Sequence, residues 1–150
     1  MDGHPYLEII AIILLICATG FFALAEFSII ASRKARLRQK KKANLWGAAA
    51  ALRLRENPES FLASIQVGIT LLTALIGVFS GATIVDYLRN YLTASSIEFL
   101  RRFASPIAVG TVVVGVTVLS SLMGELVPKY IALSYPERYA RLVAKPITIF

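Results

Sequence analysis

Three segments of this chain are long and apolar enough to cross a lipid bilayer, and they leave little choice of fold. Ile9 to Ala31 holds one charge, Glu26, while Phe61 to Val85 and Phe103 to Gly124 hold none. About 20 helical residues at 1.5 Å each span the roughly 30 Å hydrocarbon core of a bilayer. Hydrocarbon offers the backbone no hydrogen-bond partner, so such segments must be helical. The sequence therefore predicts an all-α integral membrane domain with transmembrane helices at about residues 9–31, 61–85 and 103–126.

The composition agrees with this class. The chain is 57% hydrophobic with a mean hydropathy of +0.68, whereas soluble domains have about 45–50% apolar residues. Its 150 residues fit one membrane domain, residues 1–150. One cysteine, Cys17, and one histidine, His4, give no disulfide framework and no zinc ligand set within the chain. No nucleophile with an adjacent base and no Gly-rich phosphate loop is recognisable, so we expect neither an enzyme nor a bound cofactor.

The basic residues predict the orientation in the membrane. Nine of them lie between the first two spans: Arg33, Lys34, Arg36, Arg38, Lys40, Lys41, Lys42, Arg53 and Arg55. Short loops rich in Lys and Arg stay on the cytoplasmic side. We therefore expect a multi-pass protein of the inner membrane with its N-terminus outside and its C-terminus in the cytoplasm. No aromatic side chains form a stacking surface with these residues, so we expect the lipid bilayer, and not nucleic acid, as their partner.

Two segments on the cytoplasmic side have the composition of helices that lie at the membrane interface. Residues 33–55 contain Trp46 and a run of alanines, and residues 128–145 mix tyrosines with Lys and Arg. A last apolar stretch starts at Pro146 and ends after five residues. Since that stretch completes neither a span nor a soluble domain, we expect more chain to follow.

Two carboxylates inside the spans are the best candidates for a functional site. Burying an unpaired carboxylate in a membrane is costly, so such residues often mark ion paths. Glu26 lies seven residues before Arg33, and Glu125 lies four residues before Lys129. Both are therefore expected in the cytoplasmic half of their spans, although Glu26 has the simpler alternative of an interfacial residue that leans toward Arg33.

Pro128 predicts an irregularity in the third helix beside Glu125. Proline has no N–H to donate to the carbonyl of Gly124, and its ring disfavours helical geometry at Val127. We therefore expect the third helix to break near Pro128 and to free the Gly124 carbonyl. Irregular backbone at membrane depth is tolerated where it lines a polar cavity, as in the broken helices of transporters.

Hydroxyl groups are expected at the same depth. The second span carries Thr70 and Thr73, and the third carries Ser121 one turn before Glu125. Oxygen donors of this kind suit hard cations such as Mg²⁺ or Na⁺, or an ammonium group. The predicted cation site comprises Glu125, Gly124, Ser121, Thr70, Thr73 and Glu26. Small residues such as Gly77, Gly81, Gly110 and Gly115 indicate close helix packing, either within one chain or between two.

Three motifs resemble one known family. They are Phe21-Phe22-Ala23-Leu24-Ala25-Glu26, the stretch from Asn57-Pro58 to Thr70, and Gly124-Glu125-Leu126-Val127-Pro128-Lys129. In order and spacing they resemble the transmembrane domain of the CNNM/CorC family over nearly the whole chain. The resemblance implies a homodimeric domain of three spans with short cytoplasmic-side helices, and cytosolic CBS domains beyond residue 150. It also implies Mg²⁺ efflux with Na⁺ as the coupling ion, and a cation site that includes Glu125 and the Gly124 to Pro128 element.

The first and second spans depart from the family pattern. Ala23 and Ala25 stand where transporting relatives commonly hold serine, and Ile69 stands where many hold asparagine. These changes remove oxygen donors, and a dehydrated Mg²⁺ requires about six. The sequence is closer to the hemolysin-like branch, some of whose members are implicated in polyamine export. A cation transporter for Mg²⁺ is the first expectation, and a polyamine exporter or a non-transporting membrane anchor for cytosolic domains are the alternatives.

Overall fold

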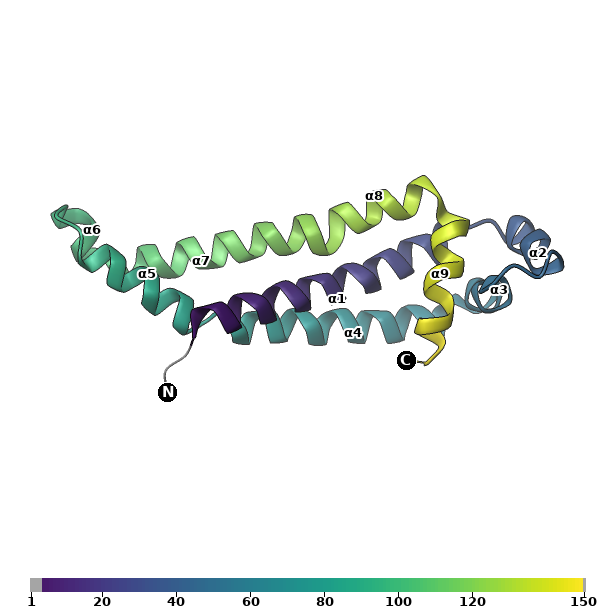
Figure 1. Cartoon of the computed structure of the whole chain (residues 1–150), viewed down its shortest axis with the longest axis horizontal. Coiled ribbons are helices and arrows are strands. Elements are labelled where there is room, and N and C mark those ends of the chain that lie inside the picture. Colours follow the sequence, from purple (N-terminus) through teal and green to yellow (C-terminus); the bar gives the residue numbers. More distant parts are fainter. Residues whose placement is uncertain (1–3, 150) are drawn as a thin grey trace.

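The computed structural model describes residues 4–149, and these form helices joined by short connections (Figure 1). Helices α1 (Pro5–Ala31), α4 (Pro58–Phe79) and α7 (Ala104–Ser121) run along the long axis of the molecule, with α1 packed against α4. Three helical stretches are long and apolar enough to cross a membrane: Pro5–Ala31, Pro58–Thr93 and Ala104–Ser134. The predicted all-α fold with three spans is confirmed.

The second predicted span ends earlier than its apolar sequence does. Helix α4 stops at Phe79, and α5 (Thr83–Thr93) starts after a three-residue break and packs on α7. The break follows Gly77 and includes Gly81, and glycine weakens a helix because it loses more backbone entropy on folding than any other residue. The Ser80 hydroxyl also donates a hydrogen bond to the Gly77 carbonyl, at 3.2 Å. The predicted range 61–85 therefore joins one helix and the start of the next.

The third helix is irregular where Pro128 predicted a break, but the chain does not unwind. Between α7 and α8 (Val127–Ser134) lies η1, a π-helical turn from Leu122 to Leu126. In this turn the N–H of Val127 donates to the carbonyl of Leu122, five residues back. A π-turn adds a residue to the helical repeat and often occurs at functional sites. The wider turn accommodates Pro128, and helical backbone continues on both sides.

The segment predicted as an interfacial helix at residues 128–145 divides into two parts. Helix α8 prolongs the third span to Ser134, and α9 (Pro136–Ile149) then turns and crosses the end of the bundle (Figure 1). Tyr135 is the corner, with φ −141° and ψ 69°. It precedes Pro136, and a residue before proline is disfavoured in helical geometry. Of these two helices, only α9 has the transverse orientation expected of an interfacial helix.

The basic segment, residues 33–55, was predicted to be helical, and it forms two helices beyond the end of the bundle that α9 crosses. These are α2 (Lys34–Lys42) and α3 (Ala48–Glu56), while α6 (Glu98–Arg102) lies at the opposite end (Figure 1). The turn between α2 and α3 fits tightly on α9. Gly47 has φ 77°, and a Cβ there would overlap the carbonyl of Arg141. Only glycine fits this position, since other residues resist this φ and would collide with α9.

A hydrophobic core joins α2, α3 and α9 to the spans. Its buried residues come from α1, α2, α3, α4 and α9 and include Ile29, Leu37, Ala51, Phe61 and Ala144. Burial of apolar surface outside lipid contributes about 25 cal/mol per Å². Helices α2, α3 and α9 are therefore one folded unit with the adjacent ends of α1 and α4.

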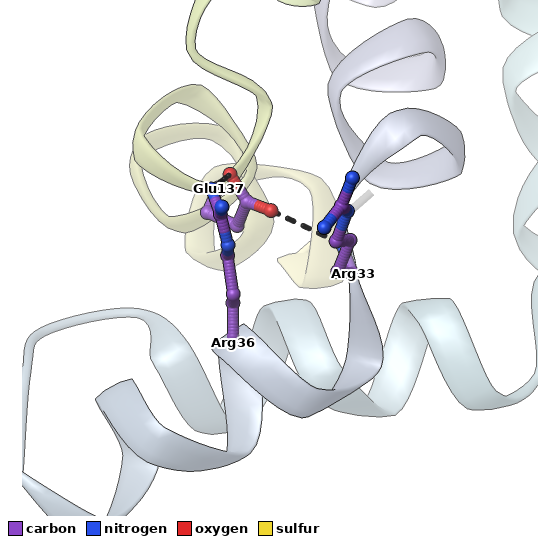
Figure 2. A network of polar contacts seen from close by, with 3 residues as sticks. All are labelled: Arg33, Arg36 and Glu137. Atoms are coloured by element: carbon purple, nitrogen blue, oxygen red, sulfur yellow. Dashed lines mark hydrogen bonds and ion pairs between the residues drawn. The ribbon is translucent and has the colours of Figure 1, made fainter.

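Glu137 holds the junction between α1 and α2, as Figure 2 shows. Its carboxylate accepts a hydrogen bond from the backbone N–H of Arg33 at 3.2 Å and lies 3.9 Å from the guanidinium of Arg36. On the other side, Nε of Arg55 donates to the carbonyl of Ser32 at 3.1 Å. Glu137 is only 7% exposed. This residue was not among the sequence candidates, because its partners lie about 100 positions away in the chain, 104 in the case of Arg33.

Candidate functional site

The π-turn packs directly on the first span through two glycines. A Cβ on Gly20 would lie 3.1 Å from the Met123 carbonyl oxygen and 3.2 Å from Cγ of Pro128. A Cβ on Gly124 would lie 3.5 Å from Cγ2 of Thr19. Small residues let helix backbones approach closely in membranes. The two glycines therefore place the turn that carries Glu125 against the middle of α1.

A first cavity lies between α1, α4, α5, α7 and η1, on the side of the π-turn toward α5. It has a volume of about 440 Å³. Its walls are mostly apolar, but six hydroxyl groups and one carboxylate line it: Thr19, Thr73, Ser80, Thr117, Ser120, Ser121 and Glu125. We call it the outer cavity. The hydroxyl of Ser120 is buried and has no hydrogen-bond partner among the described residues, so it is available to a bound molecule or ion.

A second cavity lies on the side of the π-turn toward α9, between α1, α4, η1 and α8. It has a volume of about 270 Å³, and we call it the inner cavity. Its polar lining consists of Thr19, Glu26, Gln66, Glu125 and Lys129. Two carboxylates and one ammonium thus face the same space. The two carboxylates attract cations to this cavity, whereas the ammonium group of Lys129 repels them.

Lys129 contacts Phe27, which also lines the inner cavity. Its Nζ lies 4.7 Å from the centroid of the Phe27 ring, a cation–π contact. Such contacts are favourable because the ring face carries negative charge. Glu26 lines the inner cavity, and no ion pair joins it to Arg33 among the described residues. The ion pair that the interfacial alternative favours is therefore not formed in this structure.

Glu125 and Thr19 line both cavities. The Thr19 hydroxyl donates to the Leu15 carbonyl at 2.9 Å, which leaves its oxygen lone pairs for another partner. Together these two residues mark the point where the outer and inner cavities adjoin. A cation that passed between the cavities would pass the carboxylate of Glu125.

The structure gathers most of the predicted site residues. Ser121 and Thr73 line the outer cavity, Gly124 and Glu26 line the inner cavity, and Glu125 lines both. Thr70 lines neither, because its neighbour Ile69 holds the position that faces the inner cavity. That these residues bind a cation stays a prediction.

Sequence reasoning missed four hydroxyl residues of these cavities as ligands: Thr19, Ser80, Thr117 and Ser120. Thr19 carried a usable signal. It lies seven residues before Glu26, which places both on one face of a helix. Ser120 and Thr117 carried none, because hydroxyls on membrane helices commonly bond their own backbone, and only the packing shows which of them face a cavity.

The donor set limits which ions fit. Within residues 4–149 no group of three or more His, Cys, Asp or Glu side chains is placed to hold a metal. The cavities offer two carboxylates, several hydroxyls and the amide of Gln66. Fully dehydrated Mg²⁺ requires near-octahedral ligation by about six oxygens. The lining therefore suits a partly hydrated cation or an organic ammonium better than a dehydrated Mg²⁺.

Comparison with known proteins gives the same family as the motifs. Residues 9–150 match the family described as Cyclin M transmembrane N-terminal domain, CNNM. A UPF0053 protein of Synechocystis sp. is 41% identical over 138 residues, which cover 92% of this chain and 30% of the relative. An uncharacterized protein of Mycobacterium tuberculosis is 32% identical and matches 92% of this chain and 38% of its own length. A protein of Haemophilus influenzae named polyamine export protein is 29% identical over 88% of this chain and 30% of that protein.

The chain thus spans about a third of the length of these relatives. The family match, in contrast, covers all of the described residues from Ile9 onward. It includes the three spans, the π-turn with Glu125, and the helices α2, α3 and α9. This chain belongs to the CNNM family of transmembrane domains.

Proposed function

We propose that this domain carries cations across the membrane along a path that passes Glu125. The observation that supports the proposal is that one intramembrane carboxylate, together with Thr19, lines two adjoining cavities on opposite sides of the π-turn. Ionisable residues inside membrane helices usually serve ion paths. The domain then acts as a transporter and not as an enzyme.

Mg²⁺ is the first candidate substrate, since the CNNM/CorC resemblance implies it, and Na⁺ is the candidate coupling ion. The oxygen lining requires that Mg²⁺ keep part of its water shell, because Mg²⁺ dehydrates reluctantly and the fixed donors are few. A cavity of about 270 Å³ has room for a hydrated ion, since one water occupies about 30 Å³ of liquid.

A polyamine is the second candidate, and two observations favour it. Both cavities combine apolar walls with separate polar groups, which suits the alternating methylene and ammonium groups of such a molecule. A protein that aligns with 88% of this chain, at 29% identity, also bears the name polyamine export protein. A carboxylate and hydroxyls are sufficient ligands for an ammonium, which only donates hydrogen bonds.

We also propose a homodimer in the inner membrane, with the C-terminus in the cytoplasm. A Cβ added to Gly110 or Gly115 on α7 would meet nothing within 4 Å, and the nearby Val114 is exposed. This face of α7 is free to pack on a second copy or on lipid. Gly20 and Gly124 pack closely on other helices of the same chain, whereas Gly110 and Gly115 remain open to a partner.

Transport by the full chain in liposomes tests the proposal. We expect efflux of Mg²⁺ or of a polyamine such as spermidine, which Glu125→Gln reduces to the level of empty liposomes. Glu98→Gln in α6 is the matched control, since it removes the same charge far from both cavities. Dependence of the rate on a Na⁺ gradient would identify the coupling ion. If the unmodified chain moves neither substrate, the result contradicts the proposal and favours the membrane-anchor alternative.

A further inference from the structure

A third cavity lies outside the spans, at the end of the bundle where α9 crosses it. Its volume is about 440 Å³, and it lies between α2, the turn after α2, and the corner of α8 and α9. Its charged and polar lining consists of Arg36, Gln39, Lys40, Tyr135, Glu137 and Arg138. We call it the basic cavity. None of its residues lines the outer or inner cavity.

The basic cavity has an excess of positive charge. Three cations line it against one carboxylate, Glu137. That carboxylate is already engaged, because one oxygen accepts the N–H of Arg33 and the other faces Arg36 (Figure 2). The charges of Lys40 and Arg138 have no ion-pair partner among the described residues. They come from helices almost 100 residues apart in the chain and face one space, which suits an anion with several oxygens.

The residues around the basic cavity are of the types that occur at a membrane surface. The basic cavity adjoins the exposed aromatic Tyr135, at the end of the third span. The neighbouring Trp46 is 53% exposed, and Nζ of Lys145 lies 4.9 Å from its ring centroid. Tyr and Trp are enriched at the headgroup level of bilayers. Leu45 adds an exposed apolar side chain to the cavity itself, which a free phosphate ion would not use but an acyl glycerol group would.

We propose that the basic cavity binds the phosphate of an anionic phospholipid, with Lys40 and Arg138 as its principal contacts. Basic pockets between membrane helices bind anionic headgroups in this way, and each Lys or Arg near the surface contributes measurably. Arg36 and Gln39 complete the polar lining. A lipid bound here contacts α2, the α8–α9 corner and the turn between α2 and α3. It therefore stabilises the junction of α1 and α2, where Glu137 contacts Arg33 and Arg36.

Lipid binding to the full chain tests this proposal without any transport measurement. The probe is dioleoyl phosphatidylglycerol, added to protein purified in a neutral detergent and observed by native mass spectrometry, with dioleoyl phosphatidylcholine as the zwitterionic comparison. Lys40→Gln/Arg138→Gln removes two charges of the cavity and leaves the Arg36–Glu137 pair intact. Lys41→Gln/Lys42→Gln is the matched control, because it removes two exposed charges of the same helix that do not line the cavity.

We expect phosphatidylglycerol to bind the unmodified chain and the control alike, and about tenfold more weakly to the cavity variant. Phosphatidylcholine should bind all three weakly. Equal losses in both double variants would show general attraction to the basic segment and overturn the proposal. Displacement of the lipid by millimolar inorganic phosphate would also overturn it, since the site would then take a free anion. A thermal unfolding scan of each variant without lipid, expected to be unchanged, shows that any loss is not a loss of fold.

Discussion

Gly20 in the first span faces Pro128 in the third, so closely that a Cβ on Gly20 would lie 3.2 Å from Cγ of the proline ring. The same Cβ would lie 3.1 Å from the carbonyl oxygen of Met123 in the π-turn. Neither neighbour can rotate away, because one is backbone and the other is a ring fixed to it. The position of Glu125 between the two cavities depends on this approach of α1 to η1.

Enlarging Gly20 should separate the two helices. Gly20→Val is expected to destabilise the domain by about 1–3 kcal/mol, the usual cost of overpacking, and to impair transport. Gly110→Val is the control within a single chain, since a Cβ there meets nothing within 4 Å of the same chain and should change the stability of the monomer little. Thermal unfolding in detergent measures both. Equal stabilities for the two variants would mean that the contact between α1 and η1 is looser than described.

The two alanines in the first motif should respond differently to serine. Ala23 lines the inner cavity, so Ala23→Ser adds a hydroxyl beside Glu26. Ala25 is 0% exposed and belongs to the hydrophobic core, so Ala25→Ser gains no access to the cavity and should cost about 1 kcal/mol of stability.

Mg²⁺ titration followed by thermal unfolding separates these effects. A ligand that binds the native state raises its stability by mass action. Ala23→Ser should therefore increase the stabilisation by Mg²⁺, whereas Ala25→Ser should leave it unchanged. A gain from Ala25→Ser alone would place the cation site in the core cluster instead. Tight Mg²⁺ binding by the unmodified chain, with no gain from Ala23→Ser, would show that we have underestimated its oxygen donors.

Glu137 should matter more for stability than an exposed glutamate in a similar ion pair. Glu137 is buried, and Glu137→Ala removes both the acceptor for the Arg33 N–H and the partner of the exposed Arg36, so it is expected to cost about 2–3 kcal/mol. Glu56→Ala breaks only the exposed pair with Arg38, 3.6 Å apart, and should be close to neutral. Urea or thermal unfolding of the two variants tests this, and comparable losses would argue against a structural role for the junction.

Orientation can be tested by cysteine labelling in a Cys17→Ala background. Lys40 in α2 and Asn90 in α5 lie near opposite ends of the bundle and outside its core (Figure 1). Lys40→Cys should react with an impermeant maleimide only from the cytoplasm, and Asn90→Cys only from outside, because nine basic residues favour the cytoplasmic side for the first loop. The opposite pattern would reverse the topology and the direction of the path past Glu125.

The sequence by itself determined the class of fold. Apolar segments longer than about 18 residues must be helical in hydrocarbon, and three such segments predicted three spans. Pro128 also located the irregular turn, because a missing N–H is a local property. Glu26 and Glu125 also stood out, since the position of a carboxylate within an apolar span can be read from the sequence.

Tertiary structure decided what these local signals do together. The packing of Gly20 on the π-turn let the helix absorb Pro128 as a wider turn where we had expected an open break. Because of the helix packing, Thr19 and Ser120 line a cavity and Thr70 does not. Packing also brings Glu137 into contact with Arg33, which lies 104 positions away in the chain. A sequence shows which side chains carry oxygen or charge, but the direction in which each points is set by contacts between helices, and those contacts are nonlocal.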